Sequence, residues 1–161
     1  MPKQAFHPIA DLNSKILILG TMPGESSIKK QQYYGHGANH FWKIIYSLFE
    51  QPLSQNYEER KQLLAINSIA LWDVLESCEG KGSSDSNIKN EKPNDFDTFY
   101  KNHPLIKTVF LTSGKAEKFY DKYIGKRKDL EYILLPSPSP QNKWKTFEEK
   151  VQEWEVILKH L

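Results

Sequence analysis

One short segment, residues 15–20 (KILILG), constrains the fold more than any other. Its centre is an unbroken aliphatic run, Ile16-Leu17-Ile18-Leu19. A strand that is apolar at every position is buried on both faces, which is typical of the middle of a parallel sheet. Two later runs rich in strand-forming residues, 106–111 and 132–135, resemble it in length. We therefore expect a mainly parallel sheet with residues 15–20 at its centre.

Segments with helical spacing separate these strands. They cover residues 40–49, 57–65, 94–101 and 115–123, and a last helix begins at Thr146. We expect Thr146 to cap that helix and Asn94, followed by Asp97, to cap the third. Alternating strands and helices predict an α/β fold, a three-layer α/β/α sandwich with a mainly parallel central sheet. Ligands bind such sheets at the carboxyl ends of the strands.

Length and charge limit the organisation and the partners. A chain of 161 residues suits one domain, and we expect residues 1–161 to form it. The polar stretch 80–95 is then a surface loop. The net charge is only +2, which excludes a polybasic or acidic tail as the basis of function. Only Arg60 and Arg127 are arginine, which argues against a protein that reads bases with guanidinium groups.

Cysteine count and hydropathy exclude further classes of protein. Cys78 is the sole cysteine, so an internal disulfide, an iron–sulfur cluster and a multi-cysteine zinc site are all excluded. The longest apolar run is far shorter than the roughly 20 residues that cross a bilayer. The first twelve residues, MPKQAFHPIADL, lack the apolar stretch of a signal peptide. We expect a cytoplasmic protein with no membrane partner.

The segment after the first strand, residues 20–42, is rich in glycine. It matches neither the phosphate-binding P-loop nor the dinucleotide GxGxxG pattern. Glycine lets the backbone approach a ligand closely, and Tyr33 and Tyr34 offer flat rings on which a base can stack. Asn39 immediately precedes a helix, so it is either a helix cap or a site residue.

The segment after the third strand, residues 135–142 (LPSPSPQN), has prolines at alternate positions. Prolines so placed cannot join a central strand, and they hold the backbone stiff and extended. The serines between them can donate hydrogen bonds to a phosphate or to a base edge. A stiff, protruding tip of this kind can act as a wedge in DNA.

Three ordered motifs carry a family resemblance that spans residues 15–145. They are GTMPG…YYGHGANHFWKIIY, ALWDVLESCEGKGSSDSNI and LPSPSP. Together they resemble the uracil-DNA glycosylase superfamily, and most of all its hypoxanthine-DNA (deoxyinosine) glycosylase branch. The mismatch-specific uracil/thymine glycosylases share the HxxNxFWK pattern and stay open as an alternative. The resemblance implies a monofunctional enzyme that flips a deaminated base out of DNA and hydrolyses its N-glycosidic bond.

The resemblance also implies a catalytic residue. Many relatives carry Asp or Asn two residues after the first glycine, where this chain has Met22, which cannot orient water. The family then places the polar role on the asparagine of HxxN, here Asn39. An amide can align water and hydrogen-bond the leaving base while the site stabilises the departing anion.

The remaining site residues follow from the same resemblance. The base is expected to meet the backbone of Gly20, Thr21 and Met22, the ring of Tyr34, and Ser113. Ser113 stands in a Thr112-Ser113-Gly114 sequence where relatives have asparagine-glycine, so the base preference stays open between hypoxanthine first and uracil second. Contacts with DNA are expected from Ser27, His36, Ser137 and Ser139, and the gap in the duplex is filled by Pro138, Pro140 and Gln141. The substrate is damaged duplex DNA, with single strands also open, and we expect a monomer without cofactor or metal.

Other interpretations remain at this point. A non-catalytic nucleic-acid-binding module is favoured by Met22 and Ser113, which lack the usual polar groups. A small-molecule hydrolase using Ser137 or Ser139 would lack the GxSxG nucleophile elbow. Asp73 is expected in a structural hydrogen bond, and the basic stretch 115–128 is either a solvated helix face or a DNA contact.

Overall fold

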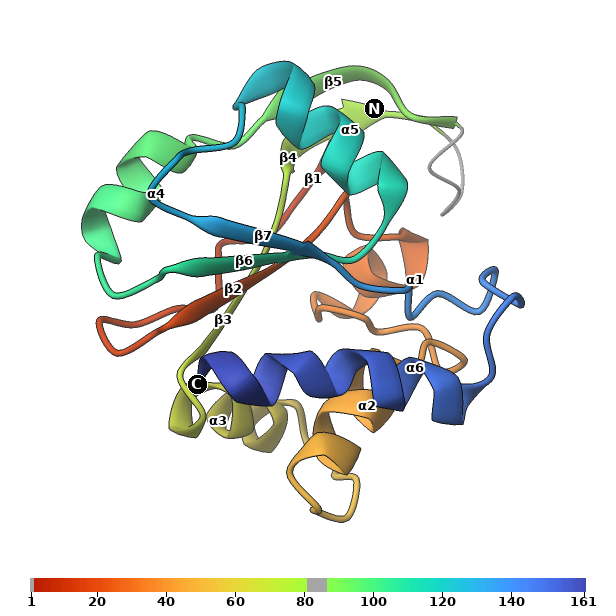
Figure 1. Ribbon diagram of the computed structural model, residues 1–161. Coiled ribbons are helices and arrows are strands. Elements are labelled where there is room, and N and C mark those ends of the chain that lie inside the picture. Colours follow the sequence, from red (N-terminus) through yellow and green to blue (C-terminus); the bar gives the residue numbers. More distant parts are fainter. Residues whose placement is uncertain (1, 81–86) are drawn as a thin grey trace.

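A computed structural model describes residues 2–80 and 87–161, which fold around a four-stranded parallel sheet (Figure 1). The strand order is β3-β2-β6-β7, with β2 (Ile16–Gly20) between β3 (Ile69–Asp73) and β6 (Thr108–Leu111), and β7 (Glu131–Leu134) at the edge. In this register Leu17 lies between Ala70 and Val109. The expected central strand is therefore confirmed.

Helices cover both faces of the sheet, because β2 sends alternate side chains to opposite sides. Ile16 and Ile18 pack toward α2 (Phe41–Leu48), α3 (Tyr57–Ile66), α6 (Phe147–Trp154) and the 3₁₀ helix η2 (Glu155–His160). Leu17 and Leu19 pack toward α4 (Phe96–Asn102) and α5 (Gly114–Tyr123). Figure 1 shows the resulting three layers, as predicted. Within the two described stretches, no helix has the length and apolar character needed to cross a bilayer.

A smaller antiparallel sheet stands beside the main one. Its order is β1-β4-β5, formed by β1 (Lys3–Gln4), β4 (Leu75–Glu79) and β5 (Lys89–Pro93). The expectation of one surface loop over residues 80–95 is therefore wrong for β5, and residues 81–86 lie outside the described residues. Backbone pairing with β4 holds β5, whose side chains are mostly charged and exposed, so its sequence carries no apolar strand signal.

The helix caps were partly predicted. Thr146 caps α6 in a full capping box, in which its side chain accepts from the Glu149 N–H and the Glu149 side chain accepts in return. The expected cap at Asn94 is wrong, because Asp95 accepts from the Thr98 N–H at 3.1 Å. The Asn94 side chain instead donates to the carbonyl of Asp73 at 2.8 Å, which fixes the end of β3.

Candidate active site

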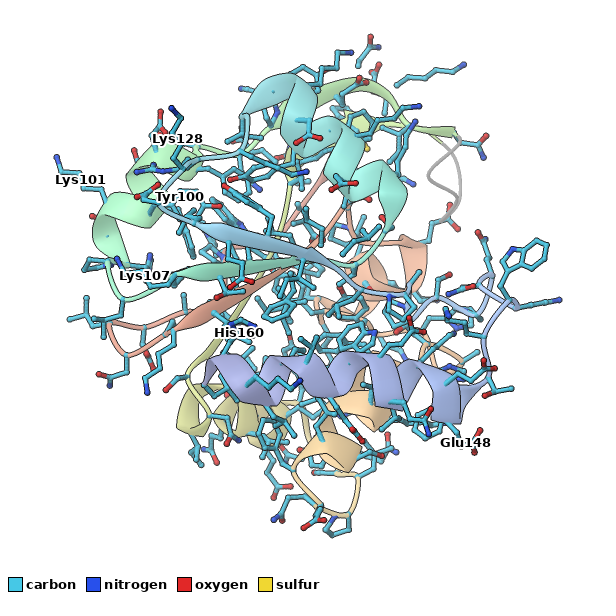
Figure 2. All side chains as sticks on the ribbon, viewed as in Figure 1. Tyr100, Lys101, Lys107, Lys128, Glu148 and His160 are labelled. Carbon is cyan, nitrogen blue, oxygen red and sulfur yellow. The ribbon has the colours of Figure 1, made fainter. Side chains whose placement is uncertain are left out.

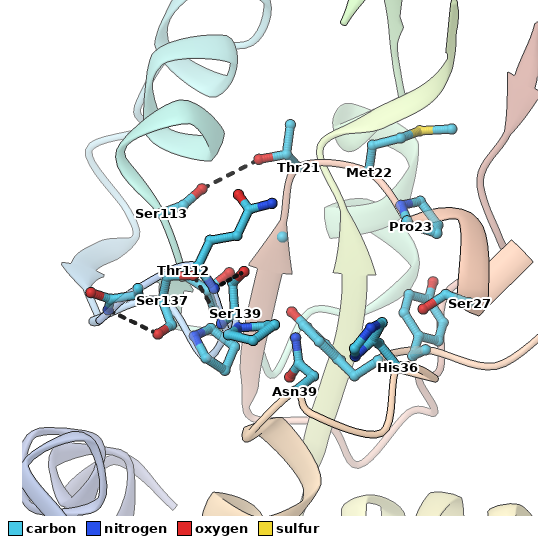
Figure 3. Close-up of a pocket in the computed structure, with 18 of the residues that line it drawn as sticks. Thr21, Met22, Pro23, Ser27, His36, Asn39, Thr112, Ser113, Ser137 and Ser139 are labelled. Carbon is cyan, nitrogen blue, oxygen red and sulfur yellow. Dashed lines mark hydrogen bonds between the residues drawn. The ribbon is translucent and has the colours of Figure 1, made fainter. Parts of the chain in front are cut away.

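A cavity of about 620 Å³ opens where the parallel strands end. Its wall comes from residues that follow β2, β6 and β7 and from Asp73 at the end of β3 (Figure 3). This volume suits a small ligand such as a nucleobase. Every residue expected to touch the base or DNA lines it: Gly20, Thr21, Met22, Ser27, Tyr34, His36, Asn39, Ser113, Ser137, Pro138, Ser139, Pro140 and Gln141.

Gly20 gives the cavity its floor. A Cβ atom at this position would lie 2.8 Å from Oδ1 of Asp73 and 3.1 Å from the hydroxyl oxygen of Tyr34. Real Cβ atoms essentially never come as close as 2.8 Å, so a side chain at residue 20 would displace the carboxylate of Asp73 and crowd the hydroxyl of Tyr34. The close approach therefore places an acceptor and a phenol beside the last residue of β2.

The two neighbouring tyrosines have different surroundings. Tyr34 adopts a left-handed backbone (φ +51°), and its ring stacks on Phe41 with centroids 4.0 Å apart and an interplanar angle of 10°. Tyr33 is only 4% exposed, and its hydroxyl donates to the carbonyl of His7 at 2.8 Å. Burial, followed by the nearby carboxylate of Asp73, raises the pKa of Tyr33. Tyr33 thus holds the loop, while Tyr34 presents its ring at the cavity wall.

Asn39 lies in the turn before α2. Its N–H donates to the carbonyl of His36 at 3.0 Å, and its Oδ1 accepts from the N–H of Phe41 at 2.8 Å. Figure 3 shows its amide nitrogen turned toward the cavity, and within residues 2–80 and 87–161 this nitrogen makes no hydrogen bond. The side chain thus combines the two interpretations: its oxygen supports the first turn of α2, and its nitrogen is presented to a ligand.

The segment after β7 is held together by its own serines. The Ser137 hydroxyl accepts from the N–H of Ser139 at 3.1 Å, and the Ser139 hydroxyl accepts from the N–H of Gln141 at 3.2 Å. The Asn142 side chain donates to the carbonyl of Ser137 at 3.0 Å. Because each hydroxyl is an acceptor within the loop, its own hydrogen is available to donate outward to a phosphate.

Only part of this segment can reach into a duplex. Pro138 is buried, and its carbonyl accepts from the N–H of His40 at 2.9 Å. Pro140 and Gln141 are exposed at the tip. Of the three residues expected to fill the gap in the duplex, Pro140 and Gln141 are therefore exposed and Pro138 is not.

Three further hydroxyl groups lie in the wall. Ser113 caps α5 by accepting from the N–H of Ala116 at 3.0 Å, and its oxygen lies 3.3 Å from Oγ1 of Thr21. Ser27 accepts from the N–H of Gly35 at 2.9 Å, which ties α1 (Glu25–Lys30) to the glycine-rich loop. These contacts join the segments after β2 and β6 into one rigid rim.

Eight lining residues were not predicted as site residues, and Asp73 and Trp144 are the most informative of them. Asp73 is only 5% exposed, and its place at the end of a buried strand is the signal that would have found it. Trp144 is 94% exposed at the rim. Nothing in the spacing of the sequence marks it, because an isolated tryptophan in a polar loop has no periodicity.

His36 and His40, four residues apart, each have another contact at Nδ1. Nδ1 of His36 accepts from the N–H of Ala38 at 3.0 Å, and Nδ1 of His40 lies 3.2 Å from Nζ of Lys150. In the part of the chain that the structure describes, no three His, Cys, Asp or Glu side chains gather as a metal ion would require.

Comparison with known proteins shows the family to which this chain belongs. The model of the uracil DNA glycosylase superfamily matches residues 7–159. A hypoxanthine DNA glycosylase of Methanosarcina barkeri is 41% identical over 85% of this chain and 87% of its own length. One of Methanosarcina acetivorans is 34% identical over 99% and 100%. The solution structure of a Methanosarcina acetivorans protein described as a uracil DNA glycosylase superposes with a TM-score of 0.85 at 34% identity, covering 99% of this chain and 98% of the other. The chain therefore belongs to the uracil DNA glycosylase superfamily.

Proposed function

We propose that this protein removes deaminated bases from DNA, hypoxanthine first and uracil second. It acts as a single-domain monomer, without metal or cofactor, and begins base excision repair in the cytoplasm. The observation that carries the proposal is the convergence of Tyr34, Asn39 and Asp73 with the loop of Ser137 and Ser139 on one cavity of about 620 Å³, which is large enough for an extruded base. Family membership and the names of the two relatives support the same activity.

The reaction breaks the bond between the base and C1′ of the deoxyribose. The extruded base stacks against Tyr34, and the amide nitrogen of Asn39 donates to the attacking water or to the leaving base. As the bond lengthens, the sugar becomes an oxocarbenium-like cation and the base becomes an anion. The water oxygen bonds to C1′, the water loses a proton, and the departing base takes one up. A donor aimed at the developing anion stabilises this transition state.

Asp73 explains why deaminated bases suit the cavity. Deamination converts adenine to hypoxanthine, replacing an amino group beside a bare ring nitrogen with a carbonyl beside N1–H. The backbone N–H groups of residues 20–22 are donors for that carbonyl, and the carboxylate of Asp73 is an acceptor for N1–H. Adenine would set N1 against the carboxylate, leaving buried polar groups unpaired. Uracil shows the hypoxanthine pattern at O4 and N3–H.

Guanine and thymine also carry a carbonyl beside a ring N–H, so this contact alone does not exclude them. A second step must discriminate against these normal bases before they enter the cavity. Extrusion supplies it, because a correctly paired base costs more to remove from the stack than a mispaired one. The loop then holds the open duplex. The hydroxyls of Ser137 and Ser139 donate to phosphates with His36 and Ser27 nearby, and Pro140 and Gln141 fill the gap above Pro138.

A panel of lesions tests the proposal. Duplexes and single strands that each carry one hypoxanthine, 1-methylhypoxanthine, uracil, xanthine or ethenocytosine are incubated with excess protein, and alkali then reveals abasic sites as strand breaks. We expect cleavage at hypoxanthine, then at uracil, and none at 1-methylhypoxanthine, which has no N1–H. Saturable binding without release of any base would contradict the proposal and favour a non-catalytic DNA-binding module.

A further inference from the structure

A buried lysine lies directly behind the proposed site. Lys150, on the first turns of α6, is 0% exposed. Its Nζ lies 3.2 Å from Nδ1 of His40 and 3.4 Å from the carbonyl oxygen of Ser139. Among the residues that the structure describes, no carboxylate lies within ion-pair distance of it. A lysine buried without a carboxylate is rare, because desolvating a charge costs free energy that neutral partners only partly restore.

The two partners of Lys150 belong to the two loops of the site. His40 directly follows Asn39, and Ser139 is the second serine of the segment after β7. The backbone joins the same loops once more, since the N–H of His40 donates to the carbonyl of Pro138 at 2.9 Å. Lys150 therefore pins together two segments that are about a hundred residues apart in sequence.

The helix α6, which carries Lys150, is held in place by further contacts. The capping box of Thr146 and Glu149 sets the start of α6. The indole N–H of Trp154 donates to the carbonyl of Pro136 at 2.9 Å, and the ring of Phe147 packs edge-on against His40 with centroids 5.4 Å apart. The position of the ammonium group is thus set by the helix.

From this geometry we infer that Lys150 is a positioning residue, which acts through neutral His40 to hold Asn39 and the Ser137–Ser139 loop in register for base excision. An ammonium group has only donors, so Nδ1 of His40 must be the acceptor, and the ring proton then sits on Nε2. A second proton on His40 would remove that lone pair and set two cations 3.2 Å apart. The contact is therefore sensitive to pH, and the inference rests on the proposed glycosylase activity.

The charges around His40 act in the expected direction. Burial first, then Lys150 on α6 and Lys43 on α2, lower the pKa of His40, while Glu148 on α6 opposes them. Burial also lowers the pKa of Lys150. His40 therefore takes up a second proton only in more acidic solution than an ordinary histidine would, and the contact is lost there.

Three variants test the inference in single-turnover excision of hypoxanthine between pH 5 and 8. Lys150→Met keeps the length of the side chain without the charge, and we expect the rate at pH 7.5 to fall about tenfold or more. Its melting temperature should stay the same or rise, since a buried unpaired charge is replaced by an apolar group. His40→Asn keeps an acceptor near the position of Nδ1 and cannot be protonated. This variant should keep most of the wild-type excision rate. It should not show the fall in rate that we expect of the wild type at acidic pH, below 6.5. Exposed Lys159→Met changes net charge equally and should behave as the wild type.

A nuclear magnetic resonance titration adds a readout that does not depend on activity. The pKa of His40 should rise toward its ordinary value in Lys150→Met, because one neighbouring cation is gone. A wild-type rate for Lys150→Met, a parallel loss of melting temperature and rate, or an unchanged fall in rate at acidic pH in His40→Asn would each overturn the inference. An inactive wild-type protein would overturn the proposed function, and with it the positioning role of Lys150. An unshifted His40 pKa would overturn the contact and the inference, and would leave the proposed function standing.

Discussion

At the scale of single residues, the two ends of the Asn39 amide have separate roles. Its Oδ1 accepts from the N–H of Phe41, and its nitrogen faces the cavity. We expect Asn39→Ala to lower the single-turnover rate about a hundredfold or more, because a donor to the developing anion is lost. It should also cost about 1 kcal/mol of stability, since the first turn of α2 loses an acceptor. Rate measurements and urea denaturation check both effects.

Asn39→Asp separates the two roles further. The carboxylate still accepts from Phe41, so stability should stay close to that of the wild type. It has no N–H to donate, so the rate should remain as low as in Asn39→Ala. Full activity in Asn39→Asp would mean that the oxygen acts as a base toward water, and the assignment to the nitrogen would be wrong.

The close contacts around Gly20 lead to a second prediction, on stability and excision. In Gly20→Ala the new methyl group meets Oδ1 of Asp73 at 2.8 Å, and buried Asp73 has little room to move away. We expect a stability loss of about 1–3 kcal/mol, as for other overpacked sites, together with loss of excision. Gly114→Ala is the matched control. Apart from its chain neighbours and the backbone of its own helix, no described atom lies within 4 Å of the added Cβ, and alanine favours the helix α5. Equal stability and equal excision rates for Gly20→Ala and Gly114→Ala would show that the cavity tolerates a side chain at residue 20.

At the scale of helices and strands, an element could be predicted from the sequence when buried apolar side chains stabilise it, and could not when backbone pairing does. The central strand and the main helices were predictable because apolar side chains at a regular period bury them. β5 was not, since backbone pairing with β4 holds a charged segment in place. The loops that form the site were recognised from their glycines, prolines and motifs. Asp73 was assigned a structural role, because only the folded sheet shows that the ends of β2 and β3 lie side by side.

The loop after β7 leads to a prediction about Trp144. The other three tryptophans, Trp42, Trp72 and Trp154, are buried, so Trp144 is the one indole that added DNA can reach directly. A nucleobase exposed by extrusion can stack on its ring. We expect lesion-containing DNA to quench the exposed-indole emission and Trp144→Phe to abolish the quenching while binding is kept. Quenching of equal size in Trp144→Phe would place the DNA elsewhere.

At the scale of the whole molecule, the distribution of charge matters more than the net charge of +2. The basic stretch 115–128 was open as a DNA contact, but carboxylates engage three of its cations. Nζ of Lys126 lies 2.8 Å from Glu117, Nε of Arg127 lies 3.1 Å from Asp129, and Nζ of Lys122 lies 3.6 Å from Glu91. These pairs favour a solvated helix face on the side of α5 over a DNA contact for this segment.

Other basic side chains lie close to the proposed site. A second hollow of about 320 Å³ lies beside the Tyr34–Asn39 turn and is lined by Lys30, Lys43 and Arg60. Lys30 donates to the carbonyl of Gly35 and Arg60 to that of Ser54, whereas exposed Lys43 forms no ion pair in the described parts of the chain. Of the three cations that line this hollow, Lys43 is therefore the one available to meet a phosphate of the lesion strand.

Salt dependence measures that contact. Each phosphate that a protein neutralises on duplex DNA contributes about 0.9 to the slope of log affinity against log salt. We expect Lys43→Gln to reduce the slope for lesion-containing duplex by about that amount, with excision at saturating protein largely kept. Lys122→Gln removes the same charge from the α5 face and should leave the slope unchanged, since Glu91 already engages Lys122. Equal slopes for Lys43→Gln and the wild type would move the phosphate path away from the second hollow. A reduced slope in Lys122→Gln would bring the α5 face into the DNA interface despite its carboxylates.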